Sequence, residues 1–123
     1  MKMNVVLAAS AAVLTGCAWL AISQVPVTNW GNMLVDPKGM TLYTFDRDPR
    51  GKSACAAQCA ADWPPLAAGT DARPAGEYAV IVRDDGRRQW TYKGKPLYLW
   101  TRDQSPGDRT GDGVNNVWRV AKP

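Results

Sequence analysis

Apolar and polar positions alternate in short runs along most of the chain, with turn-forming residues between the runs. Runs of about four to eight residues that are rich in Val, Ile, Thr and aromatic residues predict β-strands. The expected strands are residues 32–35, 41–45, 77–83, 88–92, 97–100 and 117–120. Asp36-Pro37-Lys38-Gly39 favours a turn, and Asp84-Asp85-Gly86-Arg87 favours a hairpin. We therefore expect antiparallel pairing, with the strand 77–83 buried.

One stretch favours a helix instead. Ser53 has the side chain of an N-cap, and residues 54–61 are rich in alanine. Trp63-Pro64-Pro65 then ends the helix, because a residue that precedes proline avoids helical dihedral angles. Residues 67–75, rich in Pro, Gly and Ala, are expected to form a loop. The predicted fold is a small, mainly β domain with antiparallel strands and one short helix.

The chain also repeats itself. Residues 39–48 align without a gap on residues 94–103, with five identical positions out of ten and Trp100 in the place of Phe45. Similarity at a fixed offset is the sequence signature of a repeat architecture. We expect two tandem repeats, at about residues 31–66 and 86–121.

Each repeat carries the motif Tyr-x-(Phe/Trp)-x-x-Asp. Residues two apart share one face of a strand, so the two rings of each motif are expected to point together into the core. The aspartate follows the strand, where its carboxylate can accept backbone N–H bonds in a turn. The motif therefore predicts a structural role rather than a ligand site. Its members are Tyr43, Phe45 and Asp48 in the first repeat, and Tyr98, Trp100 and Asp103 in the second.

The N-terminus has the features of an export signal. Lys2 precedes the apolar residues 5–14, and Leu14-Thr15-Gly16-Cys17 follows. This stretch resembles a bacterial lipoprotein signal, in which cleavage precedes the cysteine and a diacylglycerol is attached to it. We therefore expect residues 1–16 to be removed, Cys17 to be acylated, and residues 17–27 to form a tether to a domain at 28–121.

Two other interpretations of the N-terminus remain. The apolar stretch continues to Ile22, so residues 5–22 are long enough for an uncleaved membrane anchor. Alternatively, Ala21-Ile22-Ser23 resembles an ordinary signal-peptidase site, and cleavage there would release a protein that begins at Gln24. All three place the domain outside the cytoplasm.

The duplicated motif resembles that of the secreted-repeat lipoprotein family, described by Tyr-x-(Phe/Trp/Tyr)-x-x-Asp. The resemblance also rests on Cys-x-x-x-Cys-Ala at 55–60, Trp-Pro-Pro-Leu at 63–66, and the Pro-Gly-Asp and Gly-Val…Val-Trp elements at 106–108 and 113–118. It covers about residues 28–121. The resemblance implies an exported, usually lipid-anchored bacterial protein, and it implies no particular reaction.

Charge and composition exclude several classes of function. The formal net charge is +4, but the charges alternate in sign along the chain, whereas nucleic-acid binders cluster Lys and Arg on one face. The chain has no histidine, so it has no haem-attachment motif, no Cys/His zinc site and no Ser-His-Asp triad. The aspartates mostly fall in turns. We expect no catalytic residue, no metal and no cofactor.

Cys55 and Cys59 are the two cysteines that remain after Cys17. An even pair in an oxidising compartment predicts a disulfide, here between two positions of one helix. The alternative is a thiol-redox or copper(I) site, with Met33 or Met40 as a further donor.

The tryptophans also allow two interpretations. Large rings can build the core of a small domain, or they can stack on the sugars of peptidoglycan or a polysaccharide. We expect an envelope lipoprotein with a binding or structural role and no catalytic activity. Ala18, rather than Asp, after the acylated cysteine favours the outer membrane, with the lipid anchor as the membrane contact.

Overall fold

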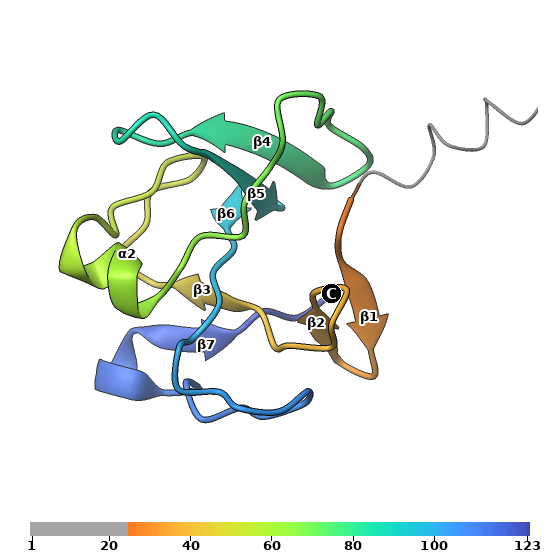
Figure 1. Cartoon of the computed structure of the whole chain (residues 1–123), viewed down its shortest axis with the longest axis vertical. Helices are drawn as coiled ribbons and strands as arrows, with labels where there is room; N and C mark the ends of the chain where they lie inside the picture. The colour runs from red at the N-terminus through yellow and green to blue at the C-terminus, as the bar shows by residue number, and fades with distance from the viewer. Residues whose placement is uncertain (1–24) are drawn as a thin grey trace, which may run out of the picture.

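Three small antiparallel sheets form the fold (Figure 1). The computed structural model describes residues 25–123, so the predicted signal and Cys17 lie outside the described residues. The first sheet joins β1 (Thr28–Trp30) to β2 (Met33–Val35), and the second joins β3 (Tyr43–Phe45) to β7 (Trp118–Val120). The third has the order β4 (Tyr78–Val82), β5 (Arg88–Tyr92), β6 (Lys95–Pro96). The predicted mainly β, antiparallel fold is confirmed.

β1 was not predicted from the sequence, and two of the predicted strands differ from expectation. β4 is half-buried rather than buried, and Val82 is 69% exposed, because β4 lies at the edge of its sheet. The predicted strand at 97–100 is also wrong in its extent, since β6 ends at Pro96. Tyr98 instead makes isolated bridges with Tyr43 and Pro65. The chain is extended there, but it pairs over too few residues to form a continuous ladder.

The helix begins later than predicted. α2 spans Gln58–Asp62, because Ala57 has a positive φ of 56° and cannot belong to a right-handed helix. Ser53 is therefore not the N-cap, and α2 has no side-chain cap. A 3-10 turn, η2 (Val114–Asn116), precedes β7.

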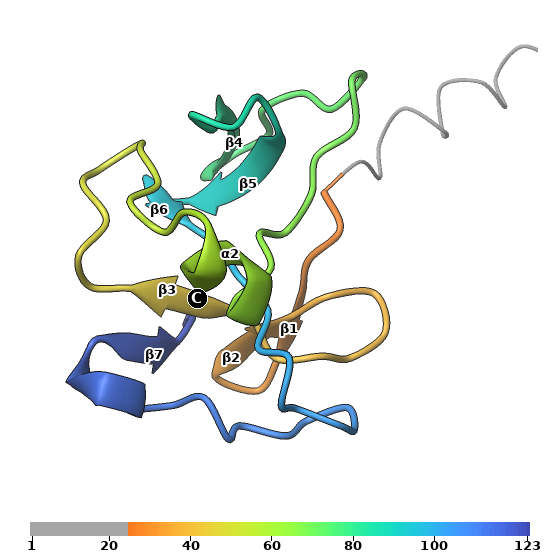
Figure 2. The ribbon, with the colours of Figure 1, turned by 60° about the vertical axis from the view of Figure 1, so that its left-hand side comes forward.

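The two repeats complete each other across a local twofold axis. Val120 of the second repeat pairs with Tyr43, and Pro65 of the first repeat bridges Tyr98. Each residue of one contact lies 55 positions from its counterpart in the other. Tyr43 and Tyr98, themselves equivalent, exchange backbone hydrogen bonds of 2.8 and 2.9 Å at the axis. Figures 1 and 2 both show β3 beside β7, with β6 on the other side of β3.

The core has two parts. One contains the disulfide and most of the aromatic rings. The other is aliphatic around one tryptophan, and it too mixes the repeats, since Leu42 and Leu97 are equivalent and both fully buried. The members of the second part are Leu34, Leu42, Leu66, Trp90, Leu97 and Ala121. Neither repeat therefore encloses a core of its own.

Candidate functional site

The motif tyrosines and aspartates form pairs that cross between the repeats. The Tyr43 hydroxyl donates to Asp103 Oδ2 at 2.7 Å, and the Tyr98 hydroxyl donates to Asp48 Oδ2 at 2.7 Å. Both tyrosines are fully buried. Each acid thus binds the tyrosine of the other repeat, a pairing that the sequence motif alone did not reveal.

The same carboxylates also hold the loops that follow them. Asp48 accepts the backbone N–H of Ala54 at 2.6 Å. Asp103 accepts the N–H and the hydroxyl of Thr110 at 3.0 and 2.6 Å. These partners lie six and seven residues downstream, outside the short turns in which we expected the aspartates to act. Each acid therefore joins a long loop to the neighbouring repeat.

Burial sets the protonation of these pairs. Desolvation, reinforced by the hydrogen bond to Asp103, raises the pKa of Tyr43 well above its usual value. Desolvation likewise raises the pKa of Tyr98, next to the Asp48 carboxylate. It also raises the pKa of Asp48, although the Ala54 N–H and the Tyr98 hydroxyl oppose that rise. Both phenols therefore stay protonated and act as hydrogen-bond donors.

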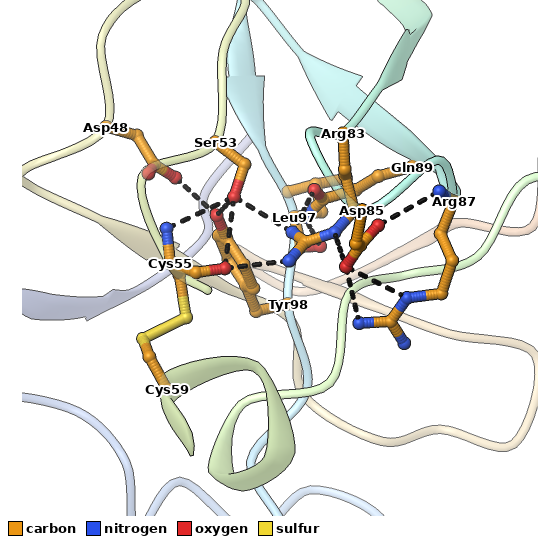
Figure 3. Close-up of polar contacts among 10 residues, drawn as sticks. All are labelled: Asp48, Ser53, Cys55, Cys59, Arg83, Asp85, Arg87, Gln89, Leu97 and Tyr98. Carbon is orange, nitrogen blue, oxygen red and sulfur yellow. Dashed lines mark hydrogen bonds and ion pairs between the residues drawn. A yellow bond between two sulfur atoms is a disulfide. The ribbon is translucent and has the colours of Figure 1, made fainter. Parts of the chain in front are cut away.

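A buried guanidinium lies beside the Tyr98 pair (Figure 3). Arg83, 5% exposed, follows β4 and donates from Nη1 to Ser53 Oγ and Gln89 Oε1 at 2.8 and 2.9 Å. Its Nη2 donates to the Cys55 carbonyl at 2.7 Å, and its Nε donates to Asp85 Oδ2 at 3.2 Å. All three guanidinium nitrogens are satisfied, as a buried charge requires.

These contacts form a hydrogen-bond chain with a fixed direction. Arginine only donates and a carboxylate only accepts, so the chain runs from Arg83 through Ser53 and Tyr98 to Asp48. Tyr43 has no such chain, and its hydroxyl accepts the Gly111 N–H at 3.2 Å instead. The sequence did not reveal the buried role of Arg83, because Arg83-Asp84-Asp85 resembles the other solvent-exposed stretches in which charges alternate in sign.

Four stacked aromatic rings join the repeats, and two of them contact the motif tyrosines edge-on. Trp63 and Trp118 are equivalent, buried and parallel, with their centroids 3.8 Å apart. Trp100 stacks on Trp63 at 3.8 Å, and Phe45 stacks on Trp118 at 4.3 Å. The outer two rings are only half-buried. Trp90 is also buried, so among the described tryptophans only Trp30, 50% exposed, presents much of its ring to solvent.

Cys55 and Cys59 form a disulfide, as predicted. Their Cα atoms lie 5.2 Å apart, but only Cys59 belongs to α2, so the expectation of two helical positions is wrong. With the sulfurs joined, neither is a free thiolate for copper(I). Met33 is buried in the same core cluster as Cys55, and Met40 lies in the turn after β2. Residues 25–123 contain no group of three or more His, Cys, Asp or Glu side chains placed to hold a metal.

A family model described as a secreted repeat of unknown function matches residues 26–67 and, a second time, residues 79–122. The chain belongs to this family of secreted repeats. The resemblance inferred from the motif is thereby confirmed, and each match contains one Tyr-x-(Phe/Trp)-x-x-Asp motif and one of the two stacked, equivalent tryptophans. Membership places the secreted-repeat domain in the cell envelope or outside the cell. Comparisons with curated proteins and with solved structures give no significant match.

Within residues 25–123 of this secreted-repeat protein, no helix has the length and apolar character needed to cross a membrane.

Proposed function

We propose that this protein is a lipid-anchored envelope protein, acylated at Cys17, that acts by binding or support and not by catalysis. The lipobox Leu14-Thr15-Gly16-Cys17 supports the anchor, and Ala18 favours the outer membrane. Residues 17–27 then tether the folded domain to the membrane surface.

One observation carries the non-catalytic part of this proposal: the reactive side chains bind each other. Both motif tyrosines donate to motif acids of the opposite repeat. The cysteines are joined to each other, and the buried guanidinium of Arg83 is fully hydrogen-bonded. Groups that are satisfied internally and withdrawn from solvent stabilise a fold, whereas catalysis needs groups that reach a substrate.

The anchor is tested by labelling cells that express the full chain with radioactive palmitate and by measuring the mass of the mature protein. We expect label on the wild-type chain, none on Cys17→Ser, and a mature chain that begins at a diacylated Cys17. An unlabelled protein of full length would show an uncleaved anchor instead. An unlabelled protein that begins at Gln24 would show ordinary signal cleavage.

A second candidate function is binding to peptidoglycan or a polysaccharide through Trp30. This ring is half-exposed, and a Cβ atom on either Gly39 or Gly107 would lie 3.5 Å from its six-membered ring, so the loops at these two glycines lie against Trp30. We expect the purified protein to sediment with sacculi and Trp30→Ala to lose that binding. Val82→Ala, at another exposed apolar side chain, is the matched control.

A further inference from the structure

A basic groove runs between two of the sheets. It has a volume of about 320 Å³ and lies where the β5–β6 turn faces the end of β7, next to β3. β6 lies directly beside β3 in both Figures 1 and 2, so the two sheets form the groove walls. Its polar lining consists mainly of Asp46, Tyr92, Lys93, Lys95, Arg119 and Lys122.

The groove has an excess of positive charge that the protein leaves unbalanced. Asp46 is its only acid, and it is occupied by Arg119, whose guanidinium donates to Asp46 Oδ2 at 3.0 and 3.1 Å. Within the described residues, none of the three lysine ammonium groups forms an ion pair. The Lys93 ammonium group lies 5.2 Å from the centroid of the neighbouring Tyr92 ring.

The fold does not require three of these four cations. At the offset of 55 residues, Lys95, Arg119 and Lys122 correspond to Met40, Pro64 and Ala67 of the other repeat. The backbone contacts around them are nevertheless conserved between the repeats, since Ala121 and Leu66 donate to the equivalent carbonyls of Leu42 and Leu97. One half of the molecule thus builds the same backbone without these three basic side chains, and only Lys93 has a basic counterpart, Lys38.

We propose that this groove binds a phosphate-bearing anion. Several cations of one sign in a concave surface focus the electrostatic potential and concentrate a ligand of opposite charge. Arg119 is engaged by Asp46, so the available donors are ammonium groups, which bind phosphate as point charges rather than as a bidentate fork. This inference rests on the binding role proposed above and names its ligand class; the phosphate can belong to a lipid headgroup or to a soluble molecule.

The first test measures the affinity of the full chain, in a neutral detergent, for inorganic pyrophosphate. We expect Lys95→Gln/Lys122→Gln to weaken binding about tenfold or more, because the variant removes two of the three lysine ammonium groups that line the groove. The control is Lys38→Gln/Lys52→Gln, which removes the same net charge from exposed lysines outside the groove and is expected to bind as the wild type does. Equal weakening in both variants would show diffuse attraction only and overturn the proposal.

The second test finds the source of the phosphate. The full chain is reconstituted in phosphatidylglycerol or phosphatidylcholine vesicles, and the acetylation of each lysine is read by mass spectrometry. Protection of Lys95 and Lys122, relative to Lys38 and Lys52, in phosphatidylglycerol alone supports a lipid headgroup. Protection by added pyrophosphate alone supports a soluble ligand. Equal acetylation of all four lysines under every condition contradicts the site.

The proposal of a lipid anchor and the proposal of an anion site can be refuted independently. The Cys17→Ser chain retains the groove, so its protection by pyrophosphate reports the anion site whether or not Cys17 is acylated. A wild-type chain that takes up no palmitate label, while pyrophosphate still protects Lys95 and Lys122, would refute the anchor alone.

Discussion

At the scale of single residues, the crossed tyrosine–aspartate pairs have unequal surroundings. Tyr98 is linked to Ser53 and through it to Arg83, whereas Tyr43 meets the backbone N–H of Gly111. A buried polar atom that loses its partner costs more than the hydrogen bond itself was worth, because the atom stays desolvated. The two equivalent tyrosines should therefore respond differently to the same substitution.

We expect Tyr98→Phe to lower the free energy of unfolding by about 1–3 kcal/mol, because it leaves Asp48 and Ser53 without their shared partner. Tyr43→Phe also removes the partner of Asp103 Oδ2 and of the Gly111 N–H, but it interrupts no hydrogen-bond chain that begins at a buried charge, so it should cost less. Urea unfolding of both variants and the wild type measures the difference. A larger loss for Tyr43→Phe would contradict the importance of the Arg83 chain.

Two aspartates are expected to affect stability in opposite ways as the pH changes. Burial raises the pKa of Asp48 above 3.8, so the folded state keeps this proton to a higher pH than the unfolded chain does. The contribution of Asp48 to the free energy of unfolding therefore falls as the pH rises from 3.8 through the raised pKa. Hydrogen bonds from the Arg87 side chain and, to a smaller extent, from its backbone N–H lower the pKa of Asp85 below 3.8. The contribution of Asp85 to the free energy of unfolding is therefore present above pH 3.8 and is lost as the pH falls.

Urea unfolding of the wild type, Asp48→Asn and Asp85→Asn over a series of acidic pH values measures these contributions. The stability advantage of the wild type over Asp48→Asn should shrink with rising pH, while its advantage over Asp85→Asn should grow. Slopes of the same sign in the two comparisons would show that one of the two environments is wrongly assigned.

At the scale of elements, the disulfide stabilises the segment that leads into α2. Cys55 is buried, and its carbonyl accepts from Arg83, so the bond fixes the 53–57 loop against the third sheet. A loop closed over so few residues removes little conformational entropy from the unfolded chain. The disulfide is therefore a local fastening and a minor part of the stability of the whole domain.

We expect Cys55→Ser/Cys59→Ser to lose about 2 kcal/mol of unfolding free energy and to keep the fold. Titration of the wild type with a thiol reagent under native, non-reducing conditions should find no free thiol at either position. The copper(I) alternative predicts the reverse: free thiols as purified, or copper(I) retained after reduction and lost in this variant.

At the scale of the molecule, neither repeat is a folding unit. β3 pairs with β7, and the aromatic stack and both tyrosine–aspartate pairs each draw on the two halves. We expect residues 25–67 and 68–123, produced separately, to lack a cooperative thermal transition by circular dichroism. A cooperative transition in either fragment as a monomer would contradict this interdependence.

The sequence predicted the individual parts better than the way they combine. The alternation of residues and the turn compositions predicted most strands, and the offset of 55 residues predicted the duplication. An alignment states which residues are equivalent but not which ones touch, so the exchange of partners between Tyr43 and Tyr98 remained hidden. The start of α2 depends on the positive φ of Ala57, and the burial of Arg83 depends on Ser53 and Gln89, which are distant from each other in sequence.

The crossing of the tyrosine–aspartate pairs also constrains a chain with a single copy of the motif. In such a chain, the crossed hydrogen bond of the tyrosine would need the acid of a second molecule. We therefore expect a symmetric homodimer, in which the segment equivalent to β7 and the equivalent tryptophan of each subunit pack on the other subunit. Fusing two copies converts that association into an intramolecular one, with an effective concentration set by the connecting segment and no longer by expression level. Fusion also frees one subunit from symmetry, and a surface such as the basic groove can then evolve on one side only.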